Sequence, residues 1–113
     1  MKIKEEIKDG IKVIRLSGKV ISGPDLMDLK TVFQASINDA MGNVLLDLGH
    51  VSWMDSSGLG VLVSGHTSLA RNGGRMAILN ATKKIHELFI ITKLITIFET
   101  FTDEGEAISS LKE

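Results

Sequence analysis

The chain has 113 residues, of which 43% are apolar and 24% charged, and its formal net charge is −1. This length supports one hydrophobic core and is too short for two, so we expect a single domain over residues 1–113. The small net charge excludes a global attraction to nucleic acid or to an anionic membrane. The lack of cysteine excludes disulfides and thiol chemistry. Residues 1–6 carry two glutamates where a signal peptide needs an apolar stretch, and no apolar run approaches the roughly 20 residues of a membrane span. We therefore expect a cytoplasmic protein.

The first 40 residues predict a β-hairpin followed by a helix. Asp9 and Gly10 mark a tight turn after a first strand, and residues 11–16 continue as a second strand. A loop is expected over residues 18–24, and Pro24 suits the first turn of a helix. Residues 41–43, Met-Gly-Asn, are expected to end it. The apolar residues at helical spacing are Leu26, Leu29, Val32, Phe33 and Ile37.

The middle of the chain predicts two parallel strands joined by a helix. Residues 44–48 are too continuously apolar for a one-sided strand, which indicates a central strand covered on both faces. A helix is expected from about Ser57 to the Asn-Gly-Gly stop at 72–74, followed by a strand over residues 75–79. Such a connection pairs its two strands in parallel. The predicted buried face of the helix consists of Leu59, Leu62, Val63, His66, Leu69 and Ala70.

The last third of the chain predicts two further helices around a short strand. Thr82 is expected to cap a helix that buries Ile85, Leu88 and Phe89. Residues 95–98 are expected to form the strand, and residues 103–111 the last helix. The predicted fold class is α/β: an N-terminal β-hairpin leading into a mixed, mostly parallel sheet with about four α-helices.

The strand-to-helix turn around Asp55, Ser56 and Ser57 is the most informative stretch. The start of a helix leaves backbone N–H groups unpaired and favours negative charge. Phosphorylation of either serine would add roughly −1.5 to −2 charges at a place that tolerates them. A plain helix cap explains the same pattern equally well. Ser57 is the better placed N-cap, which leaves Ser56 free, whereas Asp55 is expected to be a second cap or to bind the turn backbone.

At these residues the chain resembles a known family. Residues 44–48, Val-Leu-Leu-Asp-Leu, followed by residues 51–60, Val-Ser-Trp-Met-Asp-Ser-Ser-Gly-Leu-Gly, are similar to the signature of the STAS family, and most closely of its bacterial anti-sigma factor antagonists. The stretches at 73–78 and 88–94, and Phe98 followed by residues 103–107, also fit, so the resemblance covers roughly the whole chain. In that family an anti-sigma factor kinase phosphorylates the serine directly after the aspartate of the motif, which is Ser56 here, and the phosphorylated form loses its grip on the kinase.

The resemblance implies a regulator that switches between partners and has no catalysis of its own. Its unphosphorylated form would bind an anti-sigma factor of the serine kinase type and release a sigma factor, and a serine phosphatase would reverse the modification. ATP and magnesium would belong to the kinase, so no cofactor, direct nucleic-acid contact or membrane is expected. Another binding role on the same fold stays open, as a scaffold subunit of a stress-sensing complex or a soluble regulatory subunit of a membrane transporter.

The residues expected to meet the partner lie on both sides of Ser56. Gly58 and Gly60 would let another protein's backbone approach the start of the helix. Trp53 is expected either at the edge of the core or as an interface anchor. The full predicted set is Trp53, Met54, Asp55, Ser56, Ser57, Gly58, Leu59 and Gly60.

Catalytic readings of the same turn have little support in the sequence. A hydrolase nucleophile elbow requires Gly-x-Ser-x-Gly, and the residues two positions before Ser56 and Ser57 are Met54 and Asp55. No histidine has a setting that suggests a general base, and a serine without a base is a poor nucleophile. The stretch at 58–60 lacks the third glycine of a dinucleotide loop. The histidines show no close i, i+2 or i, i+4 pairing with one another or with a carboxylate, so the sequence predicts no metal site. The histidines considered are His50, His66 and His86.

Overall fold

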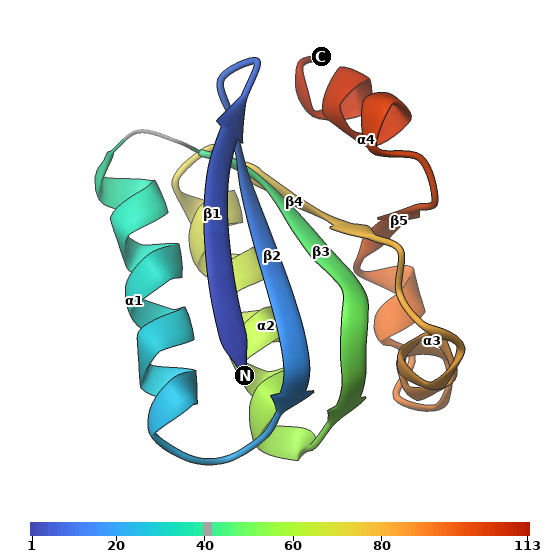
Figure 1. Cartoon of the computed structure of the whole chain (residues 1–113). Helices are drawn as coiled ribbons and strands as arrows, with labels where there is room; N and C mark the ends of the chain where they lie inside the picture. Colours follow the sequence, from blue (N-terminus) through green and yellow to red (C-terminus); the bar gives the residue numbers. More distant parts are fainter. Residues whose placement is uncertain (40–41) are drawn as a thin grey trace.

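A mixed sheet forms the frame of the protein in the computed structural model, which describes residues 1–39 and 42–113. Five strands lie in the spatial order β1-β2-β3-β4-β5 within these residues (Figure 1). β1 (Lys2–Lys8) runs antiparallel to β2 (Ile11–Val20), and the remaining neighbours pair in parallel. The other strands are β3 (Asn43–Met54), β4 (Arg75–Leu79) and β5 (Glu99–Phe101). The predicted fold class is confirmed.

Helices cover both faces of this sheet. α1 (Pro24–Asn38), α2 (Ser56–Arg71) and α3 (Lys83–Ile91) pack on one face, and α4 (Glu104–Leu111) packs on the other. A short 3₁₀ turn, η1 (Leu94–Thr96), follows α3. None of the helices within residues 1–39 and 42–113 combines the length and apolar composition needed to cross a bilayer.

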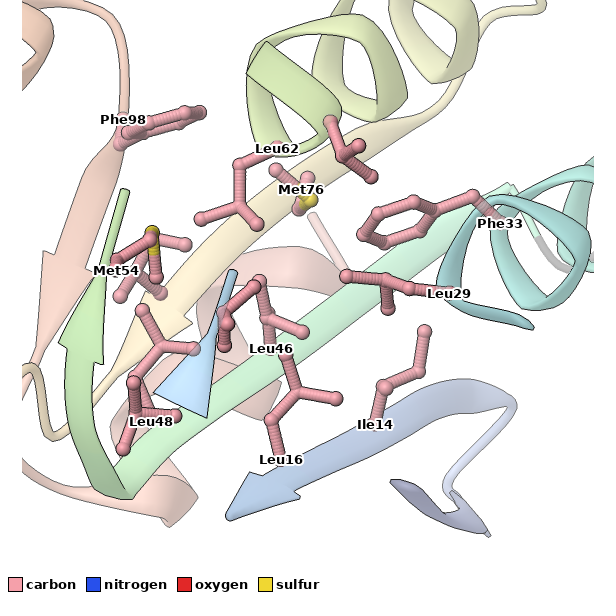
Figure 2. Packing of buried hydrophobic residues seen from close by; sticks show 14 of the residues in the cluster. Ile14, Leu16, Leu29, Phe33, Leu46, Leu48, Met54, Leu62, Met76 and Phe98 are labelled. Carbon is pink, nitrogen blue, oxygen red and sulfur yellow. The ribbon is translucent and has the colours of Figure 1, made fainter. Parts of the chain in front are cut away.

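The larger core lies between the sheet and the first three helices. Figure 2 shows Leu29 and Phe33 of α1 pointing into the same space as Leu62 of α2, above the side chains of the sheet. The smaller core lies under α4. β3 contributes side chains to both cores, because Leu46 belongs to the larger one and Leu45 to the smaller one. The two leucines are fully buried. The expectation that residues 44–48 form a central strand covered on both faces is confirmed.

β2 and β3 are longer than their apolar patterns predicted. β2 continues through Gly18 to Val20, so only residues 21–23 separate it from α1, and β3 continues past Leu48 to Met54. Register shifts between Arg15 and Ser17 and between Gly18 and Lys19 interrupt the alternation of the pair. Bulges of this kind shift the alternation of inward and outward side chains, so a search for strict period-two alternation misses the rest of the strand.

Residues 95–98 do not form the predicted strand. The chain turns after α3 at Lys93, whose φ is 64°, and winds through η1 before β5 begins at Glu99. Phe98 is buried because its ring packs against Phe89, with 5.3 Å between ring centroids. The apolar residues here serve the core from a turn, whereas the short strand that pairs with β4 is polar at its start.

The helix predictions hold in position and fail in some details. α1 begins at Pro24 as predicted and ends at Asn38; Met41, the first residue of its predicted stop, lies outside the described residues. α2 ends at the predicted Asn-Gly-Gly stop, but Ala70 of its predicted buried face is exposed. Thr82 holds the N-cap position of α3, yet its hydroxyl donates to the carbonyl of Val51 at 3.2 Å. The last helix begins after Asp103 as predicted.

An ionic cluster fastens α4 to the sheet. Arg15 Nη1 donates to Asp47 Oδ2 at 2.8 Å and to Glu104 Oε1 at 2.7 Å, and Arg15 Nη2 donates to Glu6 Oε2 at 3.1 Å. Lys8 Nζ also donates to Glu104, at 2.6 Å. These bonds lower the pKa of Glu104 to about 2, with the hydrogen bond from Arg15 as the largest cause. The cluster therefore links β1, β2, β3 and α4.

Candidate functional site

The turn that carries the two serines lies where β2 and β3 end side by side. Val20 pairs with Met54 as the last residue pair of these parallel strands. Each strand is followed at once by a turn and a helix, α1 after β2 and α2 after β3. Both helix starts therefore meet at one edge of the sheet, which is the edge where α/β proteins generally bind their ligands.

Asp55 caps α2, so the prediction that Ser57 is the N-cap is wrong. The backbone of Asp55 is extended, with φ −94° and ψ −178°, and its Oδ1 accepts the N–H of Gly58 at 2.8 Å. The helix begins at Ser56, one residue earlier than expected. A carboxylate caps as well as a hydroxyl and also favours the positive end of the helix dipole, so the aspartate takes the position that the sequence pattern had offered to Ser57.

The second carboxylate oxygen of Asp55 holds the neighbouring turn. Asp55 Oδ2 accepts the N–H of Ser22 at 2.9 Å, and the N–H of Asp55 donates to the carbonyl of Val20 at 3.2 Å. The bond from Ser22 is the largest cause that lowers the pKa of Asp55, followed by the bond from Gly58. Asp55 is thus ionised and fully engaged, which confirms the alternative that it binds the turn backbone.

Both serine side chains are exposed at the start of α2. Ser56 is the first residue of the helix and Ser57 the second. Within residues 1–39 and 42–113, no side-chain hydrogen bond engages either hydroxyl. The structure therefore brings Ser56 to the surface beside an ionised carboxylate, with its hydroxyl oxygen free.

The other predicted site residues divide into exposed and buried ones. Trp53 is 43% exposed, and Gly60 has open space where a side chain would be. Met54 is 1% exposed and belongs to the larger core. Gly58 is buried, and a Cβ there would lie 2.2 Å from the carbonyl oxygen of Val20. Close packing inside the protein explains the glycine at 58, whereas open surface surrounds Gly60.

A groove that the sequence analysis did not predict opens beside the serines. It has a volume of about 460 Å³ and runs between the starts of α1 and α2. Met27 of α1 is 64% exposed, and Ile21 of the preceding turn is 39% exposed. The parallel pairing of β2 and β3 is the signal that could have located this groove, because it brings the turn at 21–23 next to Ser56. The lining residues are Ser22, Gly23, Leu26, Met27, Lys30, Ser57, Gly60, Val61 and Ser64.

The described residues do not assemble a metal site or a catalytic pair at the turn. No group of three or more histidine, aspartate or glutamate side chains in residues 1–39 and 42–113 could hold a metal ion. His66 lies on α2 against Phe98, with 5.6 Å between the ring centroids. His50 and His86 are exposed on β3 and α3.

The STAS domain model matches residues 2–107. The chain belongs to the STAS domain family. It is 33% identical over 109 residues to the anti-sigma-B factor antagonist of Listeria monocytogenes, covering 94% of this chain and 91% of the relative. It is 27% identical over 112 residues to the anti-sigma F factor antagonist of Paenibacillus polymyxa, covering 99% and 96%. These relatives and this chain therefore match over nearly their whole lengths.

A solved structure confirms that the fold is that of the family. The unphosphorylated anti-sigma factor antagonist SpoIIAA superposes with a TM-score of 0.83 at 24% identity, covering 98% of this chain and 96% of that protein. The Bacillus cell fate determinant SpoIIAA in its phosphorylated form superposes with a TM-score of 0.76 at 23% identity, covering 96% of this chain and 98% of that protein.

Proposed function

We propose that this chain is an anti-sigma factor antagonist that binds its anti-sigma factor through the Ser56 turn and is switched off by phosphorylation of Ser56. In support, its STAS relatives of Paenibacillus and Listeria are named anti-sigma F factor antagonist and anti-sigma-B factor antagonist. The partner would be an anti-sigma factor with serine kinase activity, and a serine phosphatase would restore binding. The chain itself would act in the bacterial cytoplasm as a binding protein and not as an enzyme.

The state of the Ser56 hydroxyl is the observation that carries this proposal. Capping falls to Asp55, so the Ser56 oxygen is exposed and free to receive a phosphoryl group without loss of a helix cap. The first turn of a helix also tolerates the added negative charge. Modification at Ser56 should therefore leave the domain folded.

Charge in the contact surface gives the switch its mechanism. A phosphate on Ser56 would stand beside the ionised Asp55 and next to the groove between α1 and α2. Placing a dianion in a desolvated interface, or near the nucleotide of a kinase partner, is opposed by repulsion and by loss of hydration. Dissociation then requires no refolding of this chain.

Three of the proposed contact residues would act from the exposed start of α2 and two from below. Ser56, Ser57 and Gly60 are exposed there and can touch a partner directly, and Trp53 is exposed near the end of β3. Met54 and Gly58 are buried, so we propose that they support the shape of the turn. Leu59 is half-buried at the edge of the larger core. Asp55 would position the turn through its two backbone bonds.

Phosphorylation by the anti-sigma factor of the host tests the proposal. Incubation of both proteins with Mg-ATP should add a single phosphate, which fragment-ion mass spectrometry should place on Ser56. The chain alone with ATP should gain none. A phosphate on Ser57, or modification without a partner, would contradict the proposal.

An esterase assay distinguishes a binding module from a hydrolase. We expect only background cleavage of an activated ester, and the same rate in Ser56→Ala and Ser57→Ala. Turnover with burst kinetics that either variant abolishes would show a serine nucleophile and refute the regulatory function.

A further inference from the structure

A second surface lies on the half of the sheet that α4 does not cover. α4 packs over Val13, Leu45 and Leu79, toward the end of the sheet opposite the carboxyl ends of β2 and β3. Figure 1 shows α4 at one end of the sheet and the tips of these two strands at the other. The same face beyond α4 is open to solvent.

The register of the strands assigns side chains to this open half. Val20 and Met54 face the larger core, so their preceding residues, Lys19 and Trp53, face the other way. Lys19 and Trp53 are paired across β2 and β3, and both are exposed. A tryptophan and a lysine therefore stand side by side on the open half.

The next rows of the sheet extend the same surface toward β1. Lys2 pairs with Ser17, and Ser17 pairs with His50, which forms one row across three strands. Lys4 pairs with Arg15 in the row behind. These rows enclose a hollow of about 540 Å³, whose lining includes Lys2, Lys4, Ser17 and His50.

Positive charge is in excess on this half. Its two carboxylates, Glu6 and Asp47, are both hydrogen bonded to Arg15. Lys4 Nζ lies 3.6 Å from Glu6 but its side chain is 74% exposed. No ion pair within the described residues involves Lys2 or Lys19. Lysine charges thus point outward from a chain whose formal net charge is −1.

We propose that this half of the sheet, defined by Lys2, Lys4, Lys19, His50 and Trp53, binds an acidic segment of a partner protein. Carboxylates would meet the lysines and the imidazole N–H, and the indole would cover the apolar parts of the segment. A hollow admits side chains, whereas a flat bilayer would touch only the lysine tips. Three lysines and one aromatic ring are also few for a nucleic acid, which needs a continuous basic track.

Trp53 provides a direct readout of this binding. It is the only tryptophan of the chain, which contains no tyrosine, so the intrinsic emission comes from this surface. Titration with a decaglutamate peptide should shift the emission of Trp53 with saturation. The affinity should fall as the salt concentration rises. A decaglutamine peptide should produce no shift.

Paired lysine variants locate the binding. Lys2→Gln with Lys19→Gln should weaken decaglutamate binding about fivefold or more, since two outward charges are lost. Lys83→Gln with Lys84→Gln removes the same charge from the exposed start of α3 and should leave the affinity unchanged.

Other results would overturn the proposal. These are no emission shift with decaglutamate, or a loss of affinity in the α3 variant equal to that in the Lys2 and Lys19 variant. Tighter binding of a ten-nucleotide oligothymidylate or of vesicles with anionic lipid would assign the surface to another class of partner.

Discussion

The carboxylate of Asp55 joins two backbone segments, since its Oδ2 accepts the N–H of Ser22, 33 residues away, while its Oδ1 accepts the N–H of Gly58. One side chain thereby fixes the start of α2 and the turn before α1 together. The groove beside Ser56 depends on both segments, so its shape depends on this carboxylate.

Asp55→Ala should destabilise the protein and loosen the turn at 21–23. Two backbone N–H groups lose their acceptor, and α2 loses its cap. The unfolding midpoint in urea should fall, and amide exchange at Ser22 and Gly58 should accelerate. Ser57→Ala is the matched control and should change the free energy of unfolding by less than about 0.5 kcal/mol. A larger loss in Ser57→Ala than in Asp55→Ala would contradict the capping seen here.

Alanine at the two glycines of the turn should have opposite effects on stability. Gly58→Ala places a Cβ 2.2 Å from the carbonyl oxygen of Val20 and should cost about 1–3 kcal/mol or more in overpacking. Gly60→Ala enters open space within a helix and should stabilise the protein by about 0.4–1 kcal/mol. Urea denaturation measures both. Equal effects at the two positions would show that the close contact at Gly58 is relieved by a small backbone shift.

Substitutions at Ser56 should separate binding from folding. Ser56→Ala removes an unbonded hydroxyl, so the protein should stay folded and bind its anti-sigma factor without being switched off. Ser56→Asp adds a charge at the positive end of α2 and should leave stability unchanged or raise it by about 0.3–1 kcal/mol, while weakening partner binding. Thermal melts and binding titrations test this. Parent-like affinity in folded Ser56→Asp would refute a switch based on charge alone.

Acid should loosen the attachment of α4. The folded-state pKa of Glu104 is about 2, below its ordinary value of 4.5, so the carboxylate stabilises the fold fully at pH values above the ordinary one. This contribution is lost progressively as the pH falls from about 4.5 to about 2. Glu104→Gln should therefore show a shallower loss of stability over that range than the parent. If stability fell equally with pH in the two proteins, the loss could not be assigned to protonation of Glu104.

Local sequence patterns predicted the fold well where the residues at a position favour a single type of structure. Asp9 and Gly10 turn the hairpin as expected, and the strand at 75–79 is confirmed residue for residue. The apolar run at 95–98 misled, because its residues fill the core from a 3₁₀ turn beside α3. A short apolar pattern shows that side chains are buried. It does not show whether they are buried from a strand or from a turn.

The strand-to-helix turn that carries Ser56 was predicted in its chain position and only partly in its geometry. Ser56 was expected to be free in the turn; its hydroxyl is free, but the residue is the first of α2, and the helix cap is Asp55 and not Ser57. Both can cap a helix, so the choice between them depends on where the strand ends, which is a property of the sheet. The groove with α1 depends on contacts between segments distant in sequence, which no local pattern contains.

The ion pair between Lys8 and Glu104 spans 96 positions of the chain. During synthesis β1 is made before β2 to β5, whereas its charged partner is made only with α4. Closing so long a loop is slow in folding. Until Glu104 has been synthesised this ion pair cannot form, so the surface of the sheet under α4 stays uncovered and available to chaperones.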